Sequence, residues 1–270
     1  KDETPNLFAY VNDSCWSYGE GARSQCLIYP ETCIQNERLP LNNKYYFGDS
    51  LKGYEITAIA LKQTITNVIE KLRLDKSKLK IVIAIPPSMT NREKSYLYSA
   101  LTIAKIDCVQ FITSTYAPIE LYVNEQSPLI TNSAVIIDIG HEGARVSGFE
   151  FSRRKITQKF GLFNDNVGGK QIDENLLKLI VERYTLVLSN PLYEKQYNYK
   201  HEYEKNKYLL LTKIRKARET LSTEIEATFE YKNINITITR DDLDKCCSEI
   251  KEALTKMINL LKTNYQNLFK

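Results

Sequence analysis

The apolar run from Ala134 to Ile137 and the turn Asp138-Ile139-Gly140 that follows it constrain the fold more than any other part of the sequence. The run predicts a buried strand. A glycine after such a strand lets backbone amides approach a phosphate group closely, and an aspartate there can hold water on a metal ion. Asp138 and Gly140 are therefore candidate binding residues.

The residues after this turn predict a hairpin and then a helix. Phe149 to Phe160 is typical of two strands that turn at Ser152-Arg153-Arg154. The segment from Val167 to Asp173 then opens an amphipathic helix from Glu174 to Tyr184. Its two glycines, Gly168 and Gly169, suit the close packing of a strand on a helix start.

The first half of the chain predicts alternating strands and helices, which is an α/β pattern. Gln126-Ser127-Pro128 and Thr131-Asn132-Ser133 are expected to form a hinge. This hinge gives a partial first lobe over residues 1–132 and a second lobe over 133–270. In the first lobe, strands are expected at 7–11, 80–85 and 108–113, and helices at 56–72, 91–104 and 118–124.

The second lobe is expected to include a helical and β subdomain from about residue 185. Residues 184–208 are polar and typical of a loop or an exposed helix. Tyr208 to Leu221 predicts an amphipathic helix, followed by paired strands at 226–231 and 235–238.

The end of the chain predicts one more helix. Thr239 is expected to cap it, with acidic residues in its first turn. Apolar residues recur at helical spacing and are more typical of a core face than of a partner groove. They are Leu243, Cys246, Cys247, Ile250, Leu254, Met257, Ile258 and Leu261.

Composition fits a globular protein, because 270 residues with 43% apolar content can bury a sizeable core. The net charge of +4 is too small to argue for nucleic acid, and we expect no sequence-specific nucleic-acid binding. Ser152-Arg153-Arg154-Lys155 and the stretch Lys213 to Arg218 are local basic clusters. We interpret them as a solvated hairpin tip and helix face, with a ribosomal RNA contact as the alternative.

The six cysteines show no CxxC spacing and include the adjacent pair Cys246-Cys247. This pattern favours a reduced compartment, so we expect a cytoplasmic protein, with the endoplasmic reticulum lumen as the alternative. His141 and His201 are the two histidines, and we expect no zinc or other metal site. No apolar run reaches the roughly 18 residues that a membrane span needs, so we expect no membrane partner.

Several segments match one family pattern, in order, over nearly the whole chain. They are Glu3 to Asn6 with Ser17 to Ala22 (the family's TPS…GxxA), Ile81 to Pro87 with Asn91 to Lys94 (VPAxFxxxQR), the Asp138 turn (DLGGGTFD) and Arg218 to Ser222 (KRTLS). Together they resemble the nucleotide-binding domain of the DnaK-type (seventy-kilodalton heat-shock) chaperones. The resemblance implies an actin-like ATPase (ribonuclease H-like) fold with two lobes, incomplete in this chain.

The departures from the family pattern fall on the catalytic positions. His141 and Glu142 stand where the phosphate cradle has two glycines, which adds bulk and negative charge where a polyphosphate needs room and positive potential. Arg145 stands for the second aspartate, Glu37 for the lysine and Ser114 for the glutamate of the NEP segment. Since phosphoryl transfer depends on positioning and charge stabilisation, we expect severely impaired hydrolysis.

Asp138 then remains as a relic of the catalytic set, which caps the turn rather than orienting magnesium-bound water. Because the charges at these positions are inverted, we expect Arg145 to form an internal ion pair with Glu142 or Glu37.

The adenosine side is also altered. Arg218 replaces a lysine and Ser222 keeps a serine near the ribose, but Glu219 replaces an arginine that stacks on the base, and Arg215 replaces a glutamate. A carboxylate cannot imitate a stacking guanidinium, so we expect ATP or ADP with magnesium to bind weakly or not at all. The resemblance leaves these nucleotide-binding candidates: Asp138, Gly140, Gly168, Gly169, Arg218 and Ser222.

Two segments of the family pattern do not occur in this sequence. The hairpin GIDLGTT would precede Thr4-Pro5, and the turn VLVGGSTRIP would follow the helix that ends near Leu261. The sequence is either a fragment of a longer protein, with or without a peptide-binding domain, or a chain that has lost these segments.

Three functional classes fit these observations. The first is a non-hydrolysing DnaK-like cochaperone in protein folding, which contacts another chaperone, a J-domain protein or the ribosome, as ribosome-associated or exchange-factor relatives do. The second is an active ATP-dependent chaperone, which needs compensating groups on other segments. The third is a structural subunit of a larger assembly that retains only the fold. We favour the first class.

Overall fold

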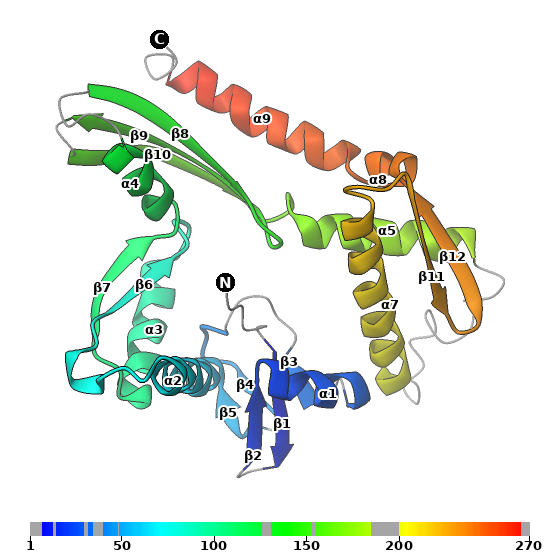
Figure 1. Ribbon diagram of the computed structural model, residues 1–270, viewed down its shortest axis with the longest axis horizontal. Coiled ribbons are helices and arrows are strands. Elements are labelled where there is room, and N and C mark those ends of the chain that lie inside the picture. Colours follow the sequence, from blue (N-terminus) through cyan, green and yellow to red (C-terminus); the bar gives the residue numbers. More distant parts are fainter. Residues whose placement is uncertain are drawn as a thin grey trace. The chain divides into compact units, whose positions relative to one another are not determined.

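The computed structural model describes residues 7–12, 15–29, 32–34, 40–47, 49–125, 131–152, 155–184 and 200–265 (Figure 1). Several sequence predictions fall outside these residues: the Thr4-Pro5 segment, Glu37, the first part of the hinge at Gln126-Ser127-Pro128, the hairpin tip at Arg153-Arg154 and the polar stretch before Lys200. The chain divides into two compact units, Lys1–Ser114 and Thr115–Lys270, which we describe separately. The lobe boundary expected near residue 132 stays a prediction.

The first unit begins with a small antiparallel sheet. Its strand order is β2 (Cys15–Tyr18), β1 (Phe8–Asn12), β3 (Cys33–Ile34), and α1 (Glu20–Ile28) packs beside it. Phe8 and Ile34 form a core with Ile56 from the next helix. The sequence patterns predicted β1 but not α1, because that helix has only two buried positions, Ala22 and Cys26.

The rest of the first unit is a strand–helix–strand unit. A short ladder of β4 (Tyr45–Tyr46) and β5 (Leu51–Lys52) leads into α2 (Gly53–Leu72). The strands β6 (Ile81–Ile85) and β7 (Cys108–Thr113) then pair in parallel, connected through α3 (Asn91–Ala104). Since a parallel pair needs such a crossover, this confirms the α/β alternation predicted from the sequence.

The second unit contains a three-stranded antiparallel sheet in the order β10 (Lys155–Asn164), β9 (Ala144–Ser152), β8 (Thr131–Ile139). The helix α4 (Tyr116–Glu125) packs against Phe149 and Phe151 of β9. The prediction of a hinge at Thr131-Asn132-Ser133 was wrong, because these residues already pair with β9 as the start of β8.

A hairpin and two helices form the main core of this unit. The helices α5 (Gly169–Arg183) and α7 (Lys200–Thr220) pack against β11 (Glu226–Tyr231) and β12 (Ile234–Thr239). Lys232 and Asn233 connect the strands with φ of 49° and 62°, as a two-residue hairpin turn requires. The helix α5 begins five residues before the expected Glu174, because the Gly-Gly segment itself is helical from Gly169.

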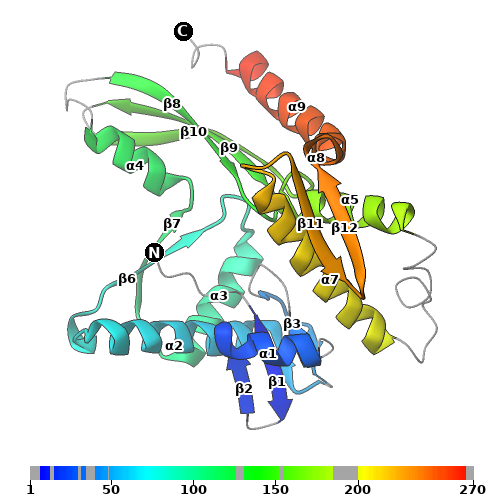
Figure 2. The ribbon, with the colours of Figure 1, turned by 45° about the vertical axis from the view of Figure 1, so that its right-hand side comes forward.

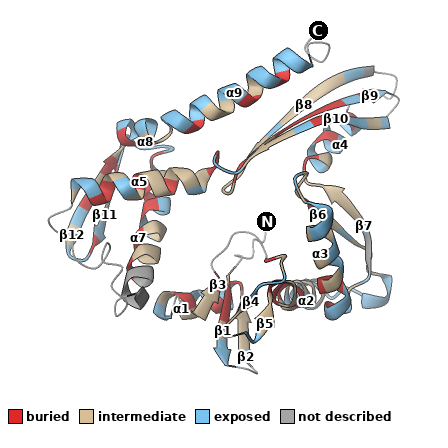
Figure 3. Cartoon of the chain, turned by 180° about the vertical axis from the view of Figure 1, so that it is seen from behind, coloured by how far each residue is buried: buried red, intermediate tan, exposed pale blue. Residues whose placement is uncertain are grey.

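The expected last helix is two helices, α8 (Arg240–Cys246) and α9 (Ser248–Asn264). Thr239 caps α8 as predicted, since its side chain accepts from the N–H of Asp242. The predicted core stripe divides at Cys247. Leu243 and Cys246 pack on the hairpin core, whereas buried residues of α9 such as Leu261 pack on the three-stranded sheet (Figure 3).

Candidate functional site

The Asp-x-Gly turn holds its aspartate in an ion pair. Asp138 on β8 lies directly opposite Arg145 on β9 in the strand register, and Arg145 Nη1 donates to the carboxylate at 3.0 Å. The Arg145 guanidinium also lies 5.5 Å from the ring centroid of Phe163. The described ion-pair partner of Arg145 is therefore Asp138 rather than the expected Glu142 or Glu37, and Glu37 lies outside the described residues.

Backbone bonds close the turn and attach it to the start of α5. The Gly140 N–H donates to the Gly143 carbonyl at 2.9 Å. The carbonyls of Gly140 and His141 accept from the N–H groups of Gly169 and Lys170 at 3.1 and 2.9 Å. The first N–H groups of a helix lack partners within the helix and often bind anions. Here two of them bond the turn instead.

Gly168 and Gly169 permit this close approach. A Cβ atom on Gly168 would collide with backbone atoms of His141, Gly143 and Gly140. A Cβ on Gly169 would lie 2.9 Å from Nδ1 of His141. Gly168 has extended backbone with φ of −166°, so the need for glycine here is steric rather than conformational.

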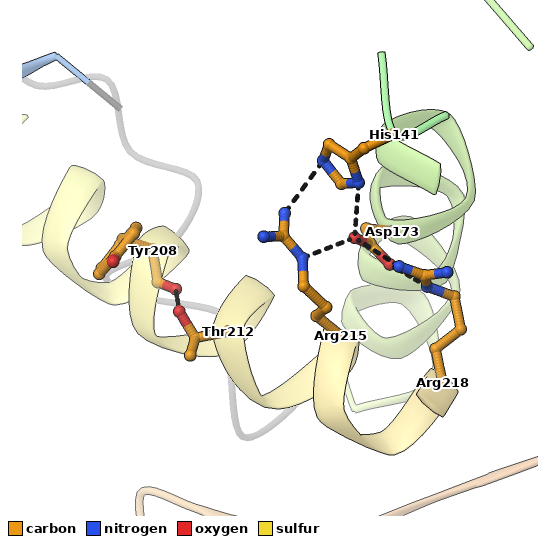
Figure 4. A network of polar contacts seen from close by, with 6 residues as sticks. All are labelled: His141, Asp173, Tyr208, Thr212, Arg215 and Arg218. Atoms are coloured by element: carbon orange, nitrogen blue, oxygen red, sulfur yellow. Dashed lines mark hydrogen bonds and ion pairs between the residues drawn. The ribbon is translucent and has the colours of Figure 1, made fainter. Parts of the chain in front are cut away.

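A buried carboxylate, Asp173, joins this turn to α7 (Figure 4). Its side chain is only 4% exposed and accepts from Nε of Arg218 at 2.6 Å and from Nε of Arg215 at 3.3 Å. Arg215 and Arg218 lie three residues apart on α7, so both reach the same carboxylate from one face of the helix. Burying this carboxylate requires such compensation.

His141 completes the network. Its Nε2 lies 3.0 Å from Nη2 of Arg215, and its Nδ1 lies 4.0 Å from the Asp173 carboxylate. An arginine can only donate, so Nε2 is the acceptor in this contact. The residue that replaces a cradle glycine in the family pattern therefore connects the turn to Arg215 and to Asp173.

The sequence patterns pointed to Arg218 but not to Asp173. Asp173 shares the buried face of α5 with Leu176 and Ile180, at helical spacing. An aspartate on an apolar helix face rarely stays unpaired. This position was the signal that could have identified the network.

Ser222 and Ser114, two other positions of the family pattern, lie outside this network. The Ser222 hydroxyl donates to the Glu219 carbonyl at 2.7 Å, just after the end of α7, and both residues are exposed. Ser114 ends the first unit, and its buried hydroxyl has no hydrogen-bond partner among the described residues. The structure therefore brings together Asp138, Gly140, Gly168, Gly169 and Arg218 within the second unit.

The described part of the chain contains neither a group of side chains that could hold a metal ion nor a helix that could cross a membrane. No group of three or more histidine, cysteine, aspartate or glutamate side chains has a geometry that could hold a metal ion. No described helix is long and apolar enough to cross a membrane.

Comparison with known families identifies the class of protein. The family model named Hsp70 protein matches residues 22–265, so the chain belongs to the Hsp70 family. Together with the mixed α/β elements, this match implies the actin-like ATPase fold.

Individual relatives are distant. Heat shock 70 kDa protein 4 from Rattus norvegicus and from Homo sapiens is 26% identical over 138 residues, which is 48% of this chain and 16% of each relative. Chaperone protein DnaK from Thermoplasma volcanium is 23% identical over 273 residues, which is 94% of this chain and 42% of the relative. The chain spans less than half the length of these relatives.

Proposed function

We propose that this chain is a non-hydrolysing member of the Hsp70 family that acts as a cochaperone by contact with a partner protein. The observation that carries this proposal is the ion pair between Asp138 and Arg145. The aspartate that would orient magnesium-bound water in the family pattern is instead neutralised by an arginine. A magnesium ion at this position would have to displace or oppose that positive charge.

The phosphate side of the site supports the same proposal. Backbone amides stabilise a phosphate only when they point at it without another partner. The Gly169 and Lys170 amides bond the turn carbonyls, and the side chains of His141 and Glu142 occupy positions where the family pattern has glycines. The turn is held closed by its own backbone.

The adenosine side supports it too. Arg215 and Arg218 both direct their Nε groups to Asp173, which offsets one of their two positive charges inside the protein. A nucleotide would have to compete with a buried carboxylate for Arg218, and Glu219 offers no stacking surface for a base.

The proposed partner is another chaperone or a J-domain protein, with the ribosome as the alternative. The proposal has two branches, a ribosome-associated protein and an exchange factor for an active Hsp70. Acceleration of ADP release from an active Hsp70 would support that branch, and salt-sensitive association with ribosomes would support the other.

The first test is calorimetric titration of the purified protein with ATP and magnesium, together with a turnover assay on the same sample. We expect no turnover, and binding that is weak or absent. Measured turnover would overturn the proposal. A variant with the family residues, H141G/E142G/R145D, is the matched comparison: a gain in ATP affinity over the wild type would locate the loss of binding at these three positions.

A further inference from the structure

The two edges of the β11–β12 hairpin are treated differently by the rest of the chain. On the outer edge of β12, the Thr237 N–H donates to the hydroxyl of Tyr184 at 3.4 Å, and Arg183 donates to the Thr237 carbonyl at 3.3 Å. Arg183 of α5 and Tyr184, which follows it, therefore satisfy this edge at Thr237. Exposed strand edges invite pairing with another chain unless they are covered in this way.

The strand register shows where the backbone groups of β11 point. Thr228 lies opposite Thr237, and the Thr237 N–H and C=O face away from β11. This is therefore a non-hydrogen-bonded pair, in which the Thr228 N–H and C=O also face outward, away from β12. The two threonine hydroxyls lie 2.9 Å apart, as the closer side chains of such a pair allow.

The outer edge of β11 is not satisfied like that of β12. Glu226 and Glu230 share the phase of Thr228, because the pattern of an antiparallel pair repeats every two residues. Among the described residues, no protein group bonds the N–H or C=O of Thr228. A row of backbone donors and acceptors therefore remains available on this side of the hairpin.

A groove of about 470 Å³ lies along this edge, between β11 and α7. β11 lies between α7 and β12 in both views of the chain (Figures 1 and 2). The groove is lined by apolar side chains, including Leu209, Ala217 and Phe229, and by the exposed lysines Lys213 and Lys216 of α7. Its size lies within the usual range for binding clefts.

The charges select the kind of chain that fits. The two lysines line the helix side of the groove, and Glu226 lies at its strand side near the start of β11. Glu230 shares the outward phase of β11 with Glu226, so the positive charge beside an added strand lies on the α7 side, at Lys213 and Lys216. Alternate side chains of such a strand point to opposite faces, so one set would face α7, where the apolar lining and the two lysines lie.

We propose that the outer edge of β11 binds an extended acidic peptide segment of a partner protein, which pairs with β11 as a third strand. Backbone bonds to Thr228 and its neighbours would supply the affinity, and Lys213 and Lys216 would select acidic side chains. This site requires no nucleotide, so it stands or falls separately from the proposed loss of ATP hydrolysis.

The test uses a fluorescein-labelled ten-residue peptide of alternating valine and aspartate, with fluorescence anisotropy on the full 270-residue chain. We expect saturable binding that weakens as salt is added. A peptide with the same sequence but N-methylated at every second residue, in either phase, is the first control. In one of the two phases the methyl groups replace the N–H hydrogens that would face β11 and block the backbone ladder. We expect the peptide of that phase to bind at least about tenfold more weakly than the unmodified peptide.

Variants of the protein test the two parts of the site. T228P removes the outward N–H without touching a bond to β12, because proline is tolerated at such an edge position. We expect it to weaken binding about tenfold, whereas T228V, which keeps the N–H, should bind like the wild type. K213E/K216E should weaken binding by a similar factor, and K256E on the exposed side of α9 should not.

Circular dichroism and thermal unfolding of each variant show that it folds. Absence of peptide binding to the wild type would overturn the proposal. Equal binding of both N-methylated peptides would also overturn it, because it would show that the backbone edge is not used. Equal binding by a folded T228P would do the same.

Discussion

Asp173 and Asp242 are two buried carboxylates of the second unit, and both are neutralised by arginine. Their side chains are 4% and 8% exposed. Arg183 holds Asp242 with two donors, and the Thr239 N–H adds a third, so Asp242 completes the cap of α8. Asp173, by contrast, contacts two arginines of α7 and the histidine of the turn.

The same kind of contact, a buried aspartate bonded by arginine, has two different roles in this unit. The Asp242 cluster holds a helix start beside a strand: Thr239 belongs to the cap itself, and Arg183 reaches the carboxylate from α5. The Asp173 cluster joins three segments that the family pattern assigns to the nucleotide, the turn at Gly140, the Gly-Gly segment and α7. The Asp173 carboxylate there offsets one of the two arginine charges and engages guanidinium groups that would otherwise be open to a bound phosphate or carboxylate.

The largest effect is expected from removing the carboxylate of Asp173. D173A leaves Arg215 and Arg218 beside a buried site without their anion, and breaking a buried pair from one side costs about 3 kcal/mol or more. Since the Arg215 side chain is 48% exposed, water recovers part of that cost. We expect a loss of about 3 kcal/mol in the free energy of unfolding, measured by urea denaturation.

D165N is the matched control, because Asp165 is exposed and lies only eight positions earlier in the chain. It should change the unfolding free energy by less than about 0.5 kcal/mol. If D173A were as stable as D165N, the two arginines would not depend on this carboxylate. If D173A gained affinity for ATP, Asp173 would be the group that competes with nucleotide for the two arginines.

A smaller, pH-dependent effect is expected at Asp242. Hydrogen bonds from Arg183, with further ones from Thr239, lower the pKa of its carboxyl from 3.8 to about 2. A lowered native pKa stabilises the protein above the unfolded value and loses that contribution as the pH falls through the native value. The stabilisation, about 2 kcal/mol, is therefore complete above about pH 5 and disappears between about pH 4 and 2.

D242N tests this linkage. The variant should be about 2 kcal/mol less stable than the wild type at pH 7, and the difference should shrink as the pH approaches 2. Chemical denaturation of both proteins at several pH values measures it. A difference that stays constant with pH would mean that Asp242 acts through packing rather than through its charge.

The two carboxylates also differ in how far the sequence could predict them. Thr239 and Asp242 form a capping box that spans only four residues, so the cap could be predicted from local sequence alone. The partners of Asp173 are separated from it by 32 to 45 residues along the chain, as the spacing of His141 and Arg218 shows. Local periodicity carries no information on such contacts.

The same limit explains the errors in the fold. The strand–helix alternation of the first unit follows from periodicity and was predicted, with α3 at its observed bounds, Asn91–Ala104. The break between α8 and α9 was not, because the apolar stripe continues across Cys247 while its residues pack on two different cores. Thr131 to Ser133 look like loop residues but join β8 because β9 continues opposite them.

The smallest expected effect concerns the pair that carries the proposed function. R145D places a carboxylate directly opposite Asp138 and removes the guanidinium from the ring of Phe163. Like charges directly opposite in a sheet are destabilising. Because Asp138 is 41% exposed, solvent screens the repulsion, and we expect a loss of only about 1 kcal/mol in thermal or chemical unfolding.

The charge-swapped double variant D138R/R145D is the decisive comparison, because it restores opposite charges at the same two strand positions. If the ion pair stabilises the turn, the double variant should recover most of the stability that R145D loses. Failure to recover it would show that Arg145 acts mainly through its contact with Phe163. Magnesium added to R145D can offset the repulsion between its two carboxylates. Stabilisation of R145D by magnesium, without stabilisation of the wild type, would indicate that the arginine excludes the metal ion from this turn.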